Sequence, residues 1–213
     1  DLSAALPIFQ ECLKRSVDES GEKSFIAIEC MRSIASIHNS NDSPDLALPF
    51  FKRLLSIFTS LLGNNAPTTL KIMKHLARCY ESTGDLLSAL PLFQECLDRS
   101  SQVNGQDTTE TLEALSDLVK CYQGMRDYES ALPLCRDCLI MNTKIFGENA
   151  TSTLQSLHDV AVCYEAIGDS VSALPLFRDC LVKRTQVFGE SAIPTLQSLS
   201  YLAKCQSNVG ETA

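Results

Sequence analysis

The sequence lacks several residue types on which common functional sites depend. It contains no Trp and only three His, which are His38, His75 and His158. None of these His lies four residues from another, the spacing that lets one helix hold a metal ion between two imidazole rings. We therefore expect no metal site.

Long apolar runs and an excess of basic residues are also missing. No run of 18 apolar residues occurs, so we expect no segment that inserts directly into a membrane. Lys and Arg together number 18 against 26 Asp and Glu, which gives a net charge of −8. Because nucleic-acid binding normally requires a basic surface, this balance predicts no nucleic-acid partner.

The usual catalytic signatures are absent from the sequence as well. There is no nucleophile elbow around a serine, no glycine-rich phosphate loop and no paired-carboxylate motif. We expect a protein that is not an enzyme, has no catalytic residues and needs no cofactor. The chain begins at Asp1 without an initiator Met, so we also expect a processed chain or a segment of a longer one.

What the sequence does contain is an internal repeat of 42 residues. Prolines recur with this step at Pro7, Pro49, Pro91, Pro133 and Pro175. Glycines keep the same step at Gly21, Gly63, Gly105, Gly147 and Gly189. Such a repeat predicts stacked copies of one structural unit, because a single unit cannot bury its own apolar face.

Each copy contains two helical patterns joined by a short turn. Leu112, Leu115 and Leu118 fall on one face of a helix. Gly84 and Asp85 form a turn in which Gly ends one helix and Asp caps the next. The spacing therefore predicts ten helices and no strands, and the proline inside each second helix predicts a local kink.

A period of 42 residues fits several repeat classes, including two-helix HEAT units and four-stranded propeller blades. The helical spacing and the missing Trp exclude the blades. The order of Leu76, Ala77, Tyr80, Gly84 and Ala89 is that of a tetratricopeptide repeat, and it resembles the 42-residue repeat of kinesin light chains. This resemblance covers the whole chain and implies an all-α, right-handed solenoid of helix-turn-helix repeats.

The resemblance also implies how the chain is organised, because in this family the helix that ends in Cys-Tyr comes first in each pair. We expect one repeat array over residues 1–213. Its parts are an orphan second helix in 1–21, complete helix pairs in 22–63, 64–105, 106–147 and 148–189, and an orphan first helix with a tail in 190–213. Both ends of such an array leave apolar layers uncapped.

The chain has ten cysteines, most of them at two repeat positions. One position holds Cys12, Cys96, Cys138 and Cys180, and the other holds Cys79, Cys121, Cys163 and Cys205. Tetratricopeptide repeats place small buried residues there, so the resemblance implies free thiols in the core. The redox spacing of Cys135 and Cys138 leaves a redox or metal role as an alternative. Many free thiols indicate a reducing intracellular compartment, with the cytoplasm as the first expectation.

The resemblance places the concave surface of the solenoid on the first helix of each pair. The adjacent Asn residues with which kinesin light chains bind peptides have no counterpart in this sequence. We expect the following candidate partner-binding residues to be exposed there: Arg32, Lys71, Lys74, His75, Arg78, Asp117, Lys120, His158, Asp159, Tyr201 and Lys204. Lys71, Lys74 and Arg78 are about one turn apart and predict a local basic patch, with a merely solvated helix face as the competing interpretation.

These features predict a scaffold for protein–protein interaction. The first hypothesis is an adaptor whose groove captures a protein or peptide segment that is partly acidic. The second is a structural subunit, or an internal segment of a larger assembly or sensor, that docks through its ends and edges. The third, an enzyme or redox protein built on Cys135 and Cys138, has only their spacing in its favour.

Overall fold

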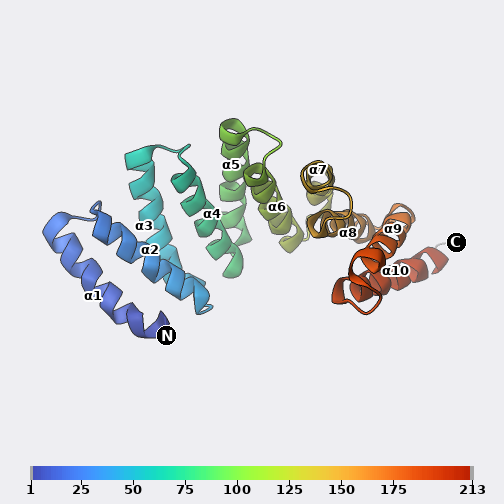
Figure 1. The fold of residues 1–213 in the computed structure, drawn as a ribbon, viewed down its shortest axis with the longest axis horizontal. Helices are drawn as coiled ribbons and strands as arrows, with labels where there is room; N and C mark the ends of the chain where they lie inside the picture. The colour runs from blue at the N-terminus through green and yellow to red at the C-terminus, as the bar shows by residue number, and fades with distance from the viewer. Residues whose placement is uncertain (1, 212–213) are drawn as a thin grey trace. The chain divides into compact units, whose positions relative to one another are not determined.

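The computed structural model describes residues 2–211, and these residues form ten α-helices and no strands (Figure 1). The predicted all-α class and the number of helices are therefore confirmed. The chain divides into two compact units, unit 1 (Asp1–Val103) and unit 2 (Asn104–Ala213). Within the described part of the chain, no helix is both long and apolar enough to cross a membrane.

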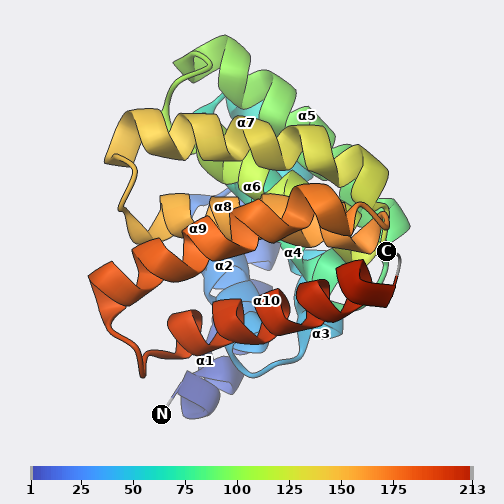
Figure 2. The same cartoon turned by 90° about the vertical axis from the view of Figure 1, so that its right-hand side faces the viewer.

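The ten helices follow one another with short connections. Unit 1 contains α1 (Leu2–Ser20), α2 (Phe25–Ser40), α3 (Pro44–Leu62), α4 (Pro67–Ser82) and α5 (Leu86–Asn104), whose last residue lies past the boundary. Unit 2 contains α6 (Thr109–Gly124), α7 (Tyr128–Phe146), α8 (Thr151–Ala166), α9 (Ser170–Phe188) and α10 (Ile193–Glu211). In unit 2, α9 packs against both α8 and α10 (Figure 2).

The turn inside a helix pair is fixed by a left-handed residue followed by an Asp. Asp169 starts α9 by accepting a hydrogen bond at Oδ1 from the backbone N–H of Ser172, at 3.0 Å. Gly168 before it has φ 88°. At the same place before α7, Arg126 takes φ 59° although it carries a side chain. The predicted turn is confirmed, with Arg126 as a departure from glycine; before α3 the left-handed residue is Asp42, with φ 55°, and Ser43 follows it.

The links between helix pairs are held by threonine side chains. Thr69, Thr111, Thr153 and Thr195 donate from Oγ1 to the carbonyl oxygens of Gly63, Gly105, Gly147 and Gly189 at 2.7–2.8 Å. All four threonines are at most 3% exposed. Each bond ties the start of a helix to the glycine that ends the helix before it, and the same link geometry occurs once in unit 1 and three times in unit 2.

Small residues bring the helices close together in the core. Ala47, Ala89, Ala131 and Ala173 occupy one repeat position and are 0% exposed. The helices that contain them continue through their prolines without interruption, and the kink at these prolines stays a prediction. The division into four complete pairs with an orphan helix at each end also stays a prediction.

Candidate functional site

One pocket in unit 1 contains part of the predicted site. It has a volume of about 480 Å³ and lies between the helices α2 and α4, with contributions from α1 and α3. Its lining residues are Phe9, Arg32, Ser33, Ser36, Ile37, Asn39, Phe51, Phe58, Thr68, Lys71, Ile72 and His75. We call this the unit 1 pocket. Three of the predicted residues, Arg32, Lys71 and His75, meet in it.

The unit 1 pocket combines an apolar floor with a cationic rim. The ring of Phe51 is buried and stacks on the ring of His75, with 5.5 Å between centroids. Lys71 is exposed and forms no ion pair with any described residue. Arg32 is also exposed and pairs with Glu29 one turn earlier on α2. This arrangement suits a ligand that has both apolar and anionic groups.

The structure divides the predicted basic patch on α4. Lys71 lines the unit 1 pocket, whereas Lys74 and Arg78 are half-buried and are not among its lining residues. The three side chains therefore do not form one uniform exposed row.

A second pocket, of about 320 Å³, lies in unit 2. Its lining residues are Gln123, Tyr128, Gln155, His158, Asp159, Val162, Gln197 and Tyr201, from α6, α7, α8 and α10. We call this the unit 2 pocket. It brings together three of the predicted residues, His158, Asp159 and Tyr201. Lys120 and Lys204 are exposed but do not line it.

The expectation that every candidate residue is exposed is wrong for six of them: Lys74, His75, Arg78 and Asp159 are half-buried, and two more are buried. Asp117 is 3% exposed and His158 is 7% exposed. The ring of His158 lies edge-on to Tyr201 of α10 at 4.8 Å and to Phe177 of α9 at 5.7 Å. α8 packs against α7 and α9 and also contacts α10 through His158, so less of it reaches solvent than the sequence pattern predicted.

Behind the unit 2 pocket is a buried arginine that the sequence reasoning missed. Arg184 of α9 is 1% exposed and donates to Pro194 O at 2.9 Å, Ser198 Oγ at 3.0 Å and Gln155 Oε1 at 2.9 Å. Among the described residues it forms no ion pair. The repeat pattern did indicate a polar residue at this place, because the equivalent positions in the two preceding copies hold Ser100 and Asn142.

Burial sets the charge states around this arginine. Burial, together with the positive charge of Arg184, lowers the pKa of His158 from 6.5 to about 4, so the ring is neutral at pH 7. Burial also raises the pKa of Asp159, although a hydrogen bond from Gln155 and the charges of Arg184 and Lys120 oppose the shift. The pocket thus presents a neutral imidazole beside a carboxyl group.

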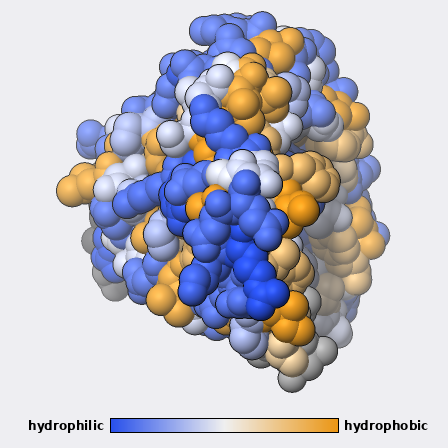
Figure 3. Space-filling model, turned by 90° about the vertical axis from the view of Figure 1, so that its left-hand side faces the viewer, coloured by the Kyte–Doolittle hydropathy of each residue, from blue (hydrophilic) through white to orange (hydrophobic). Residues whose placement is uncertain are grey.

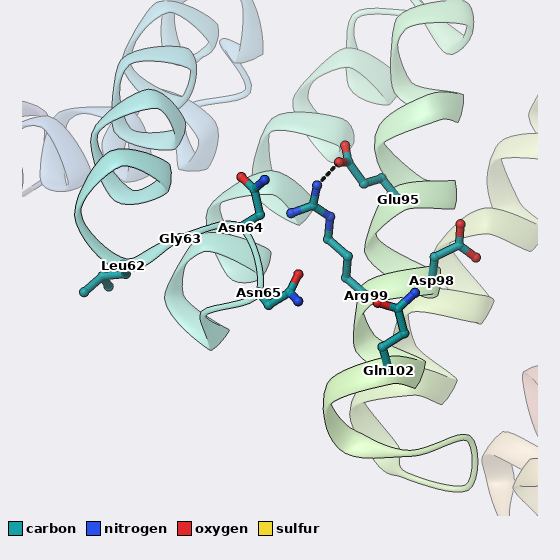
Figure 4. Close-up of a pocket in the computed structure, with 8 residues that line it drawn as sticks. All are labelled: Leu62, Gly63, Asn64, Asn65, Glu95, Asp98, Arg99 and Gln102. Atoms are coloured by element: carbon teal, nitrogen blue, oxygen red, sulfur yellow. Dashed lines mark hydrogen bonds and ion pairs between the residues drawn. The ribbon is translucent and has the colours of Figure 1, made fainter.

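A third pocket lies at the link between α3 and α4, outside the predicted groove (Figure 4). Its volume is about 520 Å³, and Asn64 and Asn65 of the link face Glu95 and Arg99 of α5 across it. Arg99 forms an ion pair with Glu95, so the charges of these two lining residues largely neutralise each other. Asp98 is the charged lining residue of this pocket outside that ion pair.

All ten cysteines are free thiols, and nine of them are buried. Cys135 lies 3.6 Å, sulfur to sulfur, from Cys163 of α8, whereas Cys138 faces Ser116 Oγ at 3.7 Å. The two residues with redox spacing thus have different partners. The described residues contain no group of three His, Cys, Asp or Glu arranged to hold a metal ion.

Comparisons with known proteins agree with this architecture. The family model of the tetratricopeptide repeat matches residues 27–102 and 110–182, more than half of the chain. No curated protein is significantly similar in sequence. A protein of Podosopora anserina, assigned as a kinesin light chain with nearly identical TPR-like repeats, is 17% identical; the match covers 88% of this chain and 89% of that one, with a TM-score of 0.76.

Two further solved structures share the fold. BtubC (BKLC) of P. vanneervenii is 15% identical, with 99% of this chain and 85% of that chain covered and a TM-score of 0.75. A Rap protein complexed with Competence and Sporulation Factor is 11% identical, with 96% and 60% covered and a TM-score of 0.58. At these identities the matches show the fold alone.

Consecutive helices that pack on one another, with a pocket in each unit, fit the class of α-solenoid scaffolds, which bind other proteins or peptides. The chain belongs to the tetratricopeptide repeat family.

Proposed function

We propose that the chain is a non-catalytic scaffold and that its unit 1 pocket binds an extended, acidic segment of a protein or peptide. The observation that carries this proposal is the meeting of Arg32 and Lys71 above a floor that contains Phe51. Apolar side chains of the segment pack on the floor, and its carboxylates face the two cations. A Rap protein that shares the fold forms a complex with Competence and Sporulation Factor, which supports a binding role.

The expected affinity comes from both parts of the pocket. An exposed ion pair contributes about 0.2–1 kcal/mol, so the cations alone hold a ligand weakly. Burial of apolar surface adds about 25 cal/mol per Å². Salt screens the interactions of exposed charges, with a screening length of about 10 Å at 0.1 M. Binding should therefore weaken as the salt concentration rises, while the contribution of buried apolar surface persists.

A charge-reversal experiment tests the proposal. The probe is a short fluorescein-labelled peptide of alternating Glu and Leu, and fluorescence anisotropy at low salt reports its binding. The double variant Arg32→Glu, Lys71→Glu should bind at least about tenfold more weakly, through repulsion and loss of two ion pairs. The matched control is Lys14→Glu, Lys23→Glu, which reverses two exposed cations of unit 1 outside the pocket.

The same assay tests the rest of the predicted patch. Lys74→Glu, Arg78→Glu should weaken binding if the bound segment continues along α4. Circular dichroism must show that each variant keeps its helix content. Equal affinity of the wild type and the Arg32, Lys71 double variant would reject the unit 1 pocket as the binding site.

Exposed apolar residues near α1 favour the second hypothesis, docking in a larger assembly. Ile8 and Ile26, 71% and 56% exposed, line a surface pocket of about 610 Å³, and Phe25 beside it is 78% exposed. Figure 3, viewed from the α1 side, shows separate hydrophobic patches among hydrophilic ones. Sedimentation of the wild type and of Phe25→Ser, Ile26→Ser should show self-association in the wild type alone if this surface docks.

A further inference from the structure

His158 has a buried ring nitrogen that lacks a partner. Its side chain lines the unit 2 pocket, and its Nδ1 is buried without a hydrogen bond from any described residue. The aromatic contacts with Phe177 and Tyr201 hold the ring in place. Buried polar atoms are normally hydrogen-bonded, so this nitrogen indicates that the pocket lacks a group that a ligand supplies.

Asp159 is held at the same pocket in a defined orientation. Gln155 accepts a hydrogen bond from Arg184 at its Oε1 and donates from its Nε2 to Asp159 Oδ1 at 2.8 Å. The other carboxylate oxygen, Oδ2, has no hydrogen bond from the part of the chain that the structure describes. Gln155 therefore fixes the carboxylate and leaves one oxygen to accept from a ligand.

The remaining walls of the unit 2 pocket suit a flat cation. Tyr128 and Tyr201 line it with aromatic side chains, of which Tyr201 also stacks on Phe177 at 5.6 Å between centroids, and Gln123 and Gln197 line it with amide side chains. Aromatic rings attract cations through their negative faces. The cation of Arg184 is not among the lining residues, because its guanidinium is held by oxygens of α10 and by Gln155.

The charge of unit 2 adds to this preference. Residues 104–213 contain eight Lys and Arg against fourteen Asp and Glu, a net charge of −6. A unit with this excess attracts cations over long range. The unit 1 pocket, with Arg32 and Lys71 at its rim, has the opposite preference.

We propose that the unit 2 pocket binds an arginine side chain of the partner, with Asp159 as its counter-charge and Tyr201 as its stacking surface. A guanidinium is planar, carries five N–H donors and pairs with a carboxylate through two hydrogen bonds. Its donors meet the acceptors of Asp159, the two glutamines and neutral His158. This inference rests on the proposed role of the chain as a protein- or peptide-binding scaffold, and not on the unit 1 pocket.

The first experiment compares two small probes on the full 213-residue chain. N-acetyl-arginine methylamide and its citrulline counterpart have the same shape, but only the first is charged. Titrations followed by two-dimensional ¹H–¹⁵N NMR should shift the backbone amides of Gln155, His158 and Tyr201. We expect the arginine probe to bind at least about tenfold more tightly than the citrulline probe. Equal affinity, or shifts that avoid these residues, overturns the inference.

The second experiment removes the counter-charge. Asp159→Asn keeps the size of the side chain and should weaken binding of the arginine probe about tenfold. Glu148→Gln makes the same change of charge in the exposed link before α8 and should leave the affinity unchanged. Tyr201→Leu should weaken binding as well, and thermal melts must show that the variants stay folded. Unchanged affinity of Asp159→Asn overturns the inference.

The two proposals fail in distinguishable ways. Asp159→Asn should bind the acidic Glu-Leu peptide as the wild type does, because that peptide is assigned to unit 1. If the acidic peptide binds and the arginine probe does not, the inference about unit 2 is rejected alone. If the arginine probe binds and the acidic peptide does not, the unit 1 pocket is rejected alone.

Discussion

At the scale of single residues, Arg126 adopts a backbone conformation that side chains disfavour. Its φ of 59° lies in the left-handed region, where the equivalent residues Gly84 and Gly168 have φ 81° and 88°. For a residue with a Cβ this conformation costs roughly 1–2 kcal/mol. The turn persists because Asp127, directly after it, caps α7 by accepting from the N–H of Ser130.

Arg126→Gly should therefore stabilise the protein. Relief of the strain is partly offset by the greater freedom of glycine in the unfolded chain, so we expect a gain of about 1 kcal/mol in the free energy of unfolding. Urea denaturation followed by circular dichroism measures it. Arg126→Ala serves as the control, since it removes the charge and keeps the Cβ. A gain of the same size in the alanine variant would contradict the backbone explanation.

His158 makes stability depend on pH in a defined window. Its pKa is about 4 in the folded chain against 6.5 as a free side chain, so the unfolded state binds more protons between these values. This contribution to stability is fully present above pH 6.5 and is lost as the pH falls towards 4. Urea midpoints measured across this range should fall less steeply in His158→Phe than in the wild type. Parallel curves for the two proteins would contradict the buried neutral ring.

Some of these residues could be predicted from the sequence, and others could not. The turn at Gly168 and Asp169 could be predicted because a left-handed residue and a helix cap are local requirements. The burial of His158 depends on Phe177 and Tyr201, which lie on other helices. The role of Arg184 depends on Gln155, 29 residues away in the chain. Contacts of this kind have no local sequence pattern.

At the scale of the helix, close packing rests on one alanine in each second helix. Ala89 in α5 is 0% exposed and is followed one turn later by the buried ring of Phe93. Any added side-chain volume at this position must displace atoms of a neighbouring helix, because protein interiors contain few voids.

Ala89→Leu should therefore destabilise unit 1 by about 1–3 kcal/mol through overpacking. Thermal melting followed by circular dichroism measures the loss. Ala4→Leu is the matched control, because Ala4 lies on a helix of the same unit and is exposed. A leucine at position 89 with unchanged thermal stability would contradict the packing described for α5.

The helices were more predictable than the surface they leave exposed. Several begin and end at local signals, such as the Asp cap of α9 and the glycine after it, Gly189, with φ 86°. The exposed strip of a first helix is set by the side chains of its neighbours. This is why Lys71 and Arg32 reach solvent as predicted while Asp117 does not. The repeat pattern predicts the helix, and tertiary packing decides which of its residues a partner can reach.

At the scale of the whole molecule, one of the ten thiols differs from the others in its exposure to solvent. Cys12 is half-buried and the other nine are buried. Burial raises the pKa of Cys79, Cys138 and Cys205 to about 11, which leaves little of the reactive thiolate at pH 7. Reactivity towards an external reagent is therefore expected to be concentrated at Cys12.

A thiol titration checks this. Native protein treated with Ellman's reagent should show one fast-reacting thiol, while denatured protein should release the signal of about ten. Cys12→Ser should abolish the fast phase and leave the slow phase unchanged. Several fast-reacting thiols in the native protein, or native disulfides seen by mass spectrometry, would contradict the structure described for the core.

The extensive contacts between helices all join elements that are consecutive in the chain, such as α2 with α3 and α8 with α9. Chains with mostly local contacts lose little entropy before their first native interactions form, so they fold quickly for their length. Within each unit, most contacts of a helix are with helices next to it in the chain. The chain is thus suited to folding during translation, one helix after another. Little apolar surface then stays exposed while distant segments of the chain are still being synthesised.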